Sequence, residues 1–209
     1  MNNLIKHIVE AFDFNSVNKQ KKVVNAYDMI LFPIINKIKH YKSLSKDEYN
    51  ILTSYTGIYK VKDKDDLKDL IAYFMNLFGN DVNLNWIDVS DITDMSYLFE
   101  ESEFNGDISK WNVSNVTNMA GMFWNTKFNG DISNWDVSKV ENMNHMFSMS
   151  IFNGDISSWN VSHVKDVRRM FSAAVEFNQD ISNWDLRSVT AARNMFWNCN
   201  IKDVYKPAV

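Results

Sequence analysis

The chain has 209 residues, of which 45% are hydrophobic and 23% charged, and its formal charge is −4. Its 6 Gly and 2 Pro exclude long flexible or proline-rich segments, and its single Cys excludes an internal disulfide and a CxxC zinc site. Trp, Met, Phe and Asn are frequent, at 7, 11, 14 and 27 residues, which favours a repeated structural unit over an enzyme.

The charge is distributed unevenly along the chain. Residues 1–80 contain 12 basic and 9 acidic side chains, whereas residues 81–209 contain 10 and 17. An acidic C-terminal part repels nucleic-acid phosphates, so we expect no direct binding of DNA or RNA. We expect no membrane span, because no run of 18 apolar residues occurs. His7 and Glu10 interrupt the apolar core of a signal peptide, which predicts a cytoplasmic protein, in the host cytoplasm if the chain is viral.

Residues 1–58 are predicted to form an α-helical N-terminal domain. Apolar side chains recur at helical spacing in residues 4–12 and again in residues 23–38. Ser45 and Glu48 match a capping box that opens a third helix. Two roles remain open, because these helices could cap the array that follows or form a module with a partner of its own.

Residues 59–83 are predicted to be an N-terminal capping helix region. Tyr59 to Val61 has the composition of a short strand. Asp63 is a favourable N-cap for the helix that follows, and Gly79 is a favourable end for it.

Residues 84–201 contain five copies of one sequence repeat. The segment from Phe104 to Phe123 returns three times with a period of 24 residues, and one extra residue precedes the last copy. A degenerate first copy begins at Leu84, and residues 202–209 remain as a C-terminal tail. Because a unit of this length cannot bury its own apolar face, the copies are expected to stack as a solenoid.

Each copy has the pattern of a short strand followed by a helix. Trp111 and Val113 alternate as in a strand, and the apolar side chains of residues 116–123 share one helical face. Ser114 between them is a favourable helix N-cap. Stacking should align the Trp, Ile, Met and Phe positions of successive copies in columns, which assigns most of these residues to the core.

The motif Phe-Asn-Gly-Asp-Ile-Ser-x-Trp-(Asn/Asp)-Val-Ser-x-Val-x-x-Met-x-x-Met-Phe resembles the DUF285 repeat. That repeat belongs to BspA-type leucine-rich-repeat surface proteins of mycoplasmas and some other bacteria, and recurs in large viruses. The resemblance covers roughly residues 60–200. It implies an α/β solenoid, right-handed and leucine-rich-repeat-like, with about five strand–helix repeats after the α-helical N-terminal domain. It supplies no catalytic residues, because the family has no general activity to transfer.

The residues with reactive side chains show no catalytic pattern. No HExxH, P-loop or GxGxxG motif occurs, and none of the four histidines is paired with a nucleophile at a repeated position. These histidines are His7, His40, His145 and His163. We therefore expect no enzymatic activity and no cofactor. Cys199 has no activating partner in the sequence and is expected to be an ordinary thiol.

Four aspartates recur at the same position of the repeat and should form a ladder. They are Asp107, Asp131, Asp155 and Asp180. Carboxylates at this spacing could bind calcium, as in some repeat proteins, but the Gly-rich calcium-binding motif is missing. Capping of loop amides is therefore the favoured role, and no metal site is predicted.

Two sets of residues are candidates for binding a protein. The first is the polar concave face expected beside the strands, where solenoids usually bind. Its members are Lys110, Asn112, Asp136, Lys139, Asn160, His163, Asp185 and Arg187. The second set is Trp124 and Trp197, which stand where other copies have Ser148 and Ser172. Large aromatic residues that do not repeat are better interface candidates than those of the core columns.

These patterns predict a non-enzymatic protein-binding module that acts inside the cell. One concrete version is a phage- or virus-encoded inhibitor whose acidic surface blocks a basic surface of a host protein, such as a nucleic-acid-handling protein. The alternative is a bacterial surface protein, similar to an adhesin, of the BspA type. A homodimer through an open C-terminal end is a further hypothesis.

Overall fold

The computed structural model describes residues 33–38 and 44–208. Residues 33–38 are helical and are followed by α4, β1, α5 and β2, with one short 3-10 helix, η1, near the C-terminus. The bounds are α4 Lys46–Thr53, β1 Tyr59–Lys60, α5 Lys64–Phe78, β2 Ile87–Asp88 and η1 Asp203–Tyr205. The helix expected at residues 4–12 and most of the one expected at 23–38 lie outside the described residues.

Helices α4 and α5 begin where the sequence predicts. The hydroxyl of Ser45 accepts the N–H of Glu48 at 3.2 Å, and the carboxylate of Glu48 accepts the N–H of Ser45 at 2.8 Å, which confirms the capping box. Asp63 caps α5 by accepting the N–H of Asp66 at 3.0 Å, and Gly79 ends the helix. The capping signals in the sequence therefore fix both helix starts.

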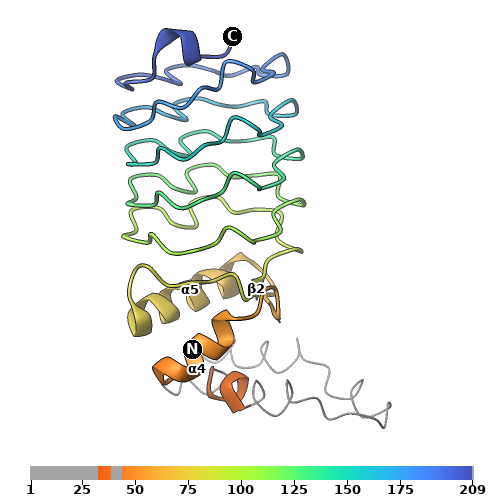
Figure 1. Cartoon of the computed structure of the whole chain (residues 1–209). Coiled ribbons are helices and arrows are strands. Elements are labelled where there is room, and N and C mark those ends of the chain that lie inside the picture. The colour runs from red at the N-terminus through yellow and green to blue at the C-terminus, as the bar shows by residue number, and fades with distance from the viewer. Residues whose placement is uncertain (1–32, 39–43, 209) are drawn as a thin grey trace.

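Helix α5 closes the first end of the stacked coils, with α4 beyond it (Figure 1). The buried ring of Phe74 lies 4.7 Å from that of Trp86, and the ammonium of Lys64 bonds to the carboxylate of Asp94 at 3.0 Å. Strand β1 pairs in parallel with β2, with Tyr59 opposite Ile87. A single hydrophobic cluster includes Ile34, Leu52 and the interior of every coil.

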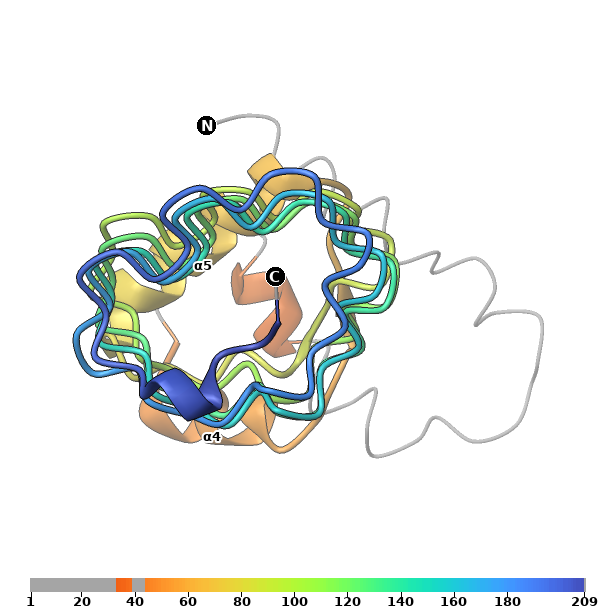
Figure 2. The ribbon, with the colours of Figure 1, turned by 90° about the horizontal axis from the view of Figure 1, so that it is seen from above.

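Beyond α5 the chain winds in stacked coils of 24 or 25 residues, which superpose when viewed along the stack (Figures 1 and 2). The expected columns are confirmed. Two run through the core as stacked phenylalanine rings, and a third contains tryptophans. One column is Phe104, Phe128, Phe152 and Phe177, with centroids 6.0, 6.2 and 6.4 Å apart. The other is Phe99, Phe123, Phe147, Phe171 and Phe196, spaced by 5.5, 5.6, 5.6 and 5.7 Å.

The prediction of a helix in each copy is wrong. None of residues 116–125 is helical: residues 120–125 form turns, and the φ angles of Gly121 and Asn125 are 58° and 52°, which a right-handed helix excludes. The N–H of Gly121 donates to the carbonyl of Asn144 in the next coil at 2.8 Å. Because a neighbouring coil supplies acceptors along this whole segment, the backbone bonds between coils instead of within a helix. Apolar spacings of three and four residues fit both arrangements.

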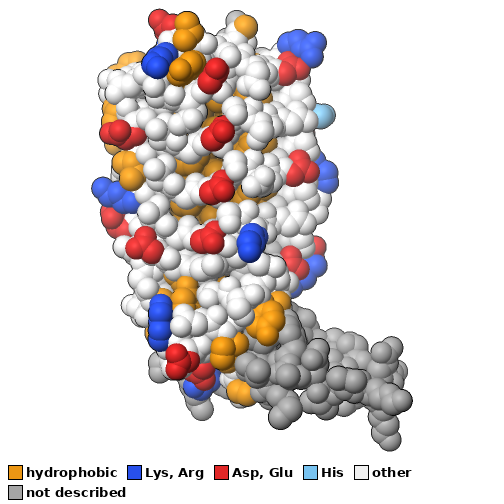
Figure 3. Space-filling model, viewed as in Figure 1, with side chains coloured by type: hydrophobic (Ala, Val, Ile, Leu, Met, Phe, Trp, Pro, Cys, Tyr) orange, Lys and Arg blue, Asp and Glu red, His pale blue; other side chains and the backbone are white. Residues whose placement is uncertain are grey.

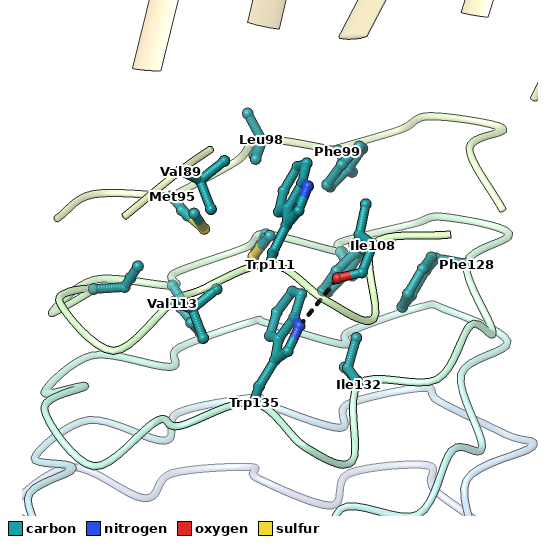
Figure 4. Close-up of a cluster of buried hydrophobic side chains, with 14 of the residues drawn as sticks. Val89, Met95, Leu98, Phe99, Ile108, Trp111, Val113, Phe128, Ile132 and Trp135 are labelled. Carbon is teal, nitrogen blue, oxygen red and sulfur yellow. Dashed lines mark hydrogen bonds between the residues drawn. The ribbon is translucent and has the colours of Figure 1, made fainter. Parts of the chain in front are cut away.

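The strand expected at Trp111 and Val113 does not form either. The backbone ladder between coils lies on residues 95–101 and their equivalents, whose alternate N–H groups donate to carbonyls of the next coil at 2.7 to 3.1 Å. Trp111 is instead tied through its indole N–H, which donates to the carbonyl of Leu84 at 2.9 Å. Trp135 makes the equivalent bond to Ile108 (Figure 4). The right hand of the winding and the kinship with leucine-rich repeats stay predictions.

The C-terminal tail folds back across the last coil. Tyr205 in η1 accepts the N–H of Ile181 at 3.0 Å, and Ile201 and Pro207 are buried. In Figure 2 the segment that follows η1 runs toward the middle of the ring formed by the coils. The described residues are thus capped at both ends of the stack.

Candidate protein-interaction surface

The aspartate ladder is a structural device. Each Oδ1 accepts the backbone N–H two residues further on, at 2.9 or 3.0 Å. The four aspartates are Asp107, Asp131, Asp155 and Asp180. The prediction that they cap loop amides is therefore confirmed. Hydrogen bonds from the hydroxyl and N–H of Ser133 lower the pKa of Asp131, because they stabilise its ionised form. Within residues 33–38 and 44–208, no three His, Cys, Asp or Glu residues gather as a metal site would require.

An asparagine ladder runs beside the aspartates and joins consecutive coils. Asn105 Oδ1 accepts the N–H of Asn129 at 2.9 Å, and Asn129 Oδ1 accepts the N–H of Asn153 at 2.8 Å. The series continues through Asn178 to the N–H of Lys202 at 3.0 Å. Both ladders use their acceptor oxygens inside the fold, so the regular polar residues are largely scaffold.

The predicted concave residues come together at one edge of successive coils. Four of them cap turns by accepting a backbone N–H at 3.1 or 3.2 Å, as the aspartate ladder does. These are Asn112, Asp136, Asn160 and Asp185. Lys139 donates to Asn115 of the preceding coil at 2.7 Å, whereas Lys110 and His163 are exposed. Their role in binding a partner stays a prediction.

Arg187 and Asp185 form the strongest charge pair of this edge. Two guanidinium nitrogens of Arg187 contact the carboxylate of Asp185, at 2.8 and 2.6 Å. These bonds, followed by the backbone N–H of Arg187, lower the pKa of Asp185 to about 2. The Arg187 side chain is nevertheless 90% exposed, so its guanidinium stays accessible to a partner while it contacts Asp185.

An open hollow of about 310 Å³ lies between two coils near their aspartates. Its lining residues are Asp155, Ser157, Gln179, Asp180, Ser182 and Asn183. The hydroxyl of Ser182 donates to Asp180 at 2.7 Å, and the side chain of Asn183 donates to the carbonyl of Ser157 at 3.1 Å. No histidine lines it, so the hollow holds no Ser-His pair for nucleophilic catalysis.

The described histidine His163 and the cysteine Cys199 have local contacts. His163 Nδ1 lies 3.4 Å from the hydroxyl of the adjacent Ser162, which itself donates to Asn160 at 2.7 Å. Burial raises the pKa of the Cys199 thiol, which disfavours the reactive thiolate. His7 and His40 lie outside the described residues.

A different side of the stack carries residues that do not repeat. We define the variable side as residues 96–101, 120–125, 144–149, 168–173 and 193–198. Its backbone is regular, because the ladder of hydrogen bonds between coils runs through it. Its outward residues change from coil to coil: Tyr97, Met149, Arg169 and Trp197 are exposed there, and Trp124 is half-buried. Acidic side chains, in contrast, recur regularly up the face seen in Figure 3.

The two predicted tryptophans both lie on the variable side but do not touch. Trp124 is half-buried and Trp197 is 62% exposed, and the coils that contain Ser148 and Ser172 separate them. Sequence reasoning missed Tyr97, which is 40% exposed, together with Met149 at 54%. The sequence signal that could have identified them is a repeat position at which the residue differs from copy to copy, whether the residues there are large or small.

The C-terminal half of the variable side is basic. Arg168, Arg169 and Arg193 lie there, and Arg168 is paired with Asp166 at 2.6 Å. Burial and the nearby charges of Arg169 and Arg168 lower the pKa of His145. The shift is consistent with arginines lying close to His145, so this end presents positive charge on an otherwise acidic repeat region.

Comparison with known proteins identifies a family but no function. The profile described as "Mycoplasma protein of unknown function, DUF285" matches residues 67–151 and 125–204. No curated protein and no solved structure matches the chain. In the described part of the chain, no helix is long and apolar enough to cross a membrane.

Proposed function

We propose that this chain, which belongs to the DUF285 family, is a non-enzymatic protein-binding module that binds its partner through the variable side. The observation that carries the proposal is the contrast between polar positions that repeat in every coil and exposed positions whose residues differ from coil to coil. The ladders at Asn129 and Asp131 repeat because each coil needs them. The variable side shares the backbone regularity of the ladders, yet its exposed side chains are free to differ.

The composition of the variable side supports binding to protein. Trp, Tyr and Arg are the residues that most often dominate the energy of protein interfaces. Trp197, Tyr97 and Arg169 present these three types on one side of the stack, all of them exposed. Because the backbone ladder beneath these side chains is already ordered, binding a partner costs less conformational entropy.

The test compares two double variants of the full chain as baits in native lysate. Trp124→Ala with Trp197→Ala truncates the variable side, and Lys110→Ala with Lys139→Ala truncates the concave edge as a matched control. We expect a specific partner, identified by mass spectrometry, to be lost with the tryptophan variant and retained with the lysine variant. The opposite pattern would move the binding site to the concave edge. If both variants retain the partner, neither the variable side nor the concave edge is its binding site.

A second candidate function rests on the acidic column visible in Figure 3. Asp107, Asp131 and Asp155 lie one coil apart and remain ionised, because their hydrogen bonds lower their pKa values. Such a column could block a basic surface of another protein. A partner held in this way should dissociate at least about tenfold more readily as salt rises from low to physiological strength. Binding that ignores salt would eliminate this candidate.

A further inference from the structure

The last coil has a row of unpaired backbone N–H groups. In the four coils before it, alternate N–H groups of the variable side donate to carbonyls of the coil that follows. Arg169 donates to Arg193 at 3.1 Å, and Phe171 donates to Met195 at 2.9 Å. No coil follows the last one, and within the described residues the structure shows no acceptor for its equivalent N–H groups. These belong to Ala192, Asn194, Phe196 and Asn198.

A carbonyl at the start of this row is unpaired as well. The carbonyls of Thr117, Glu141 and Lys165 each accept two N–H groups of the next coil, at 2.8 to 3.3 Å. Thr190 is their equivalent in the last coil, and no described residue donates a backbone N–H to it. We define the open edge as residues 190–198, with one acceptor followed by four donors. An unpaired edge of this kind is a template for pairing with another chain.

The C-terminal tail caps another part of the last coil. Its backbone contact is at Ile181, whose N–H donates to Tyr205 at 3.0 Å. Lys206 reaches the open edge with its ammonium, 5.9 Å from the centre of the Phe196 ring, but no described tail residue bonds to the backbone of the edge. Seen along the stack, η1 lies above α4, and the tail does not cross the last coil above α5 (Figure 2).

A second copy of the chain does not match the open edge through either end of its stack. Two last coils placed face to face would set N–H donors against N–H donors. The first coil offers carbonyls instead, but α5 lies over that end, and the ammonium of Lys64 donates to the carbonyl of Ser96 at 3.0 Å. The matching occupant is therefore an extended segment of another protein, with a carbonyl available at every second residue.

We propose that the open edge binds an extended acidic segment of a partner protein, which pairs in parallel in the place that a sixth coil would take. The acidic character follows from Arg169 and Arg193, which are exposed and form no ion pair among the described residues. Trp197, which is 62% exposed, adds an apolar contact on the same edge. The inference rests on the proposed function, because it names the partner class and its place on the variable side.

Hydrogen exchange of the free full chain tests whether the edge is open. The N–H groups of Asn194 and Phe196 should exchange at least about 100-fold faster than those of Arg169 and Phe171, their paired equivalents one coil earlier. Equal rates would overturn the proposal, because the edge would then be paired already. Protection that disappears on dilution would identify a second copy as the occupant, which also overturns it.

The binding test adds a synthetic peptide of residues 93–101 with blocked ends to the full chain, as a stand-in for the partner segment. Its sequence, Thr-Asp-Met-Ser-Tyr-Leu-Phe-Glu-Glu, carries three carboxylates and pairs in this way in the first coil. Residues 117–125, Thr-Asn-Met-Ala-Gly-Met-Phe-Trp-Asn, give a matched peptide without charge. We expect the acidic peptide to bind with a dissociation constant on the order of 0.1–1 mM, at least about fivefold more tightly than the uncharged one.

Variants of the chain test the role of the arginines. Arg169→Ala with Arg193→Ala should remove the preference for the acidic peptide, and Lys110→Ala with Lys139→Ala is the control that should keep it. In the original chain, the bound peptide should slow exchange at the N–H groups of the open edge. A preference that survives the arginine variant would refute the acidic character of the partner.

Two changes to one peptide unit test the direction of the hydrogen bonds. In the proposed pairing, the carbonyl of Leu98 in the peptide accepts the N–H of Phe196, and the N–H of Phe99 in the peptide points away from the chain. Methylation of that N–H should change the affinity by less than about twofold. An ester at the same unit has a weaker acceptor oxygen and should weaken binding at least about threefold. Equal losses from the two changes would contradict this pairing.

The outcome separates the inference from the proposed function. If neither peptide binds at about 2 mM, several times the expected dissociation constant, or if protection appears away from residues 190–198, the open edge is not the binding site. If Trp124→Ala with Trp197→Ala nevertheless loses its lysate partner, the pairing at the edge is refuted and the proposed function stands.

Discussion

The indole N–H of Trp135 donates to the carbonyl oxygen of Ile108 in the preceding coil at a distance of 3.2 Å. The tryptophans of the other full copies make the same bond at 2.9 to 3.2 Å. Each indole thus fills the core and also ties two coils together. Tryptophan suits this position because it combines a large apolar ring with one hydrogen-bond donor.

Replacing Trp135 with Phe should lower the free energy of unfolding by about 1–3 kcal/mol. The variant loses the buried hydrogen bond to Ile108 and leaves a small cavity beside it. The measurement is the urea midpoint. Trp197→Phe is the control, because its side chain is 62% exposed, and we expect a change within about 0.5 kcal/mol. Equal midpoints for the two variants would show that the indole bond contributes nothing.

Gly121→Ala should destabilise the chain more than Gly57→Ala. Both glycines have φ near 60°, at 58° and 59°, so both variants suffer backbone strain of about 1–2 kcal/mol. A Cβ at residue 57 meets nothing within 4 Å, whereas one at residue 121 would lie 2.4 Å from the ring of Tyr97. We expect roughly 1–3 kcal/mol of extra cost from this overlap.

A double variant isolates the contact between these two residues. Adding Tyr97→Ala to Gly121→Ala should recover the extra cost and leave only the backbone strain. The free energies come from denaturant unfolding of the three variants and the original chain. If the double variant is no more stable than Gly121→Ala, steric overlap with Tyr97 is not the cause.

Asp185 should make stability depend on pH in the acid range. Its folded pKa is about 2, lowered by the side chain of Arg187, so its contribution is fully present above the unfolded value of about 4. That contribution is lost as pH falls from about 4 toward about 2. The urea midpoint of the original chain should therefore fall more steeply over this range than that of Asp185→Asn. In Arg187→Ala, NMR titration should show the carboxyl pKa closer to its usual value, and an unchanged pKa would exclude the guanidinium as the cause.

Asn153→Ala should break one step of the asparagine ladder. Asn153 Oδ1 accepts the N–H of Asn178 at 2.9 Å and the amide of Gln179 at 3.0 Å. The expected loss is about 1 kcal/mol, with faster hydrogen exchange at the N–H of Asn178. Asn153→Asp keeps the acceptor oxygen and should protect that N–H better than Ala does. Equal exchange in all three proteins would mean that the side-chain bond does not protect it.

Much of the fold was predictable because apolar columns and capping residues have local signals. The column that begins at Phe104 follows from the repeat period, and the start of α5 follows from Asp63. The turns at Gly121 and Asn125 were not predictable from apolar spacing, because inward positions three and four residues apart fit a helix equally well. The choice depends on acceptors in the next coil, which lie 23 residues away in sequence and leave no local pattern.

The candidate site was predictable only in part. Trp124 and Trp197 stand out because each replaces a small residue in its column. Arg169 and Tyr97 share a column with Gly121, where no consensus exists and so no exception is visible. That column becomes recognisable as one surface only when the ladder between coils is known.

The ladders give this chain the properties of an adjustable spacer. The bond that the N–H of Asn153 donates to Asn129 and the bond that Trp159 donates to Ile132 need only an identical coil as neighbour, not a particular place in the stack. A duplicated coil could therefore be inserted between α5 and η1 with every bond renewed, moving the two ends apart by about 4.8 Å. Gain or loss of single coils in the gene would therefore change the length of the stack in fixed steps, while the caps at both of its ends stay unchanged.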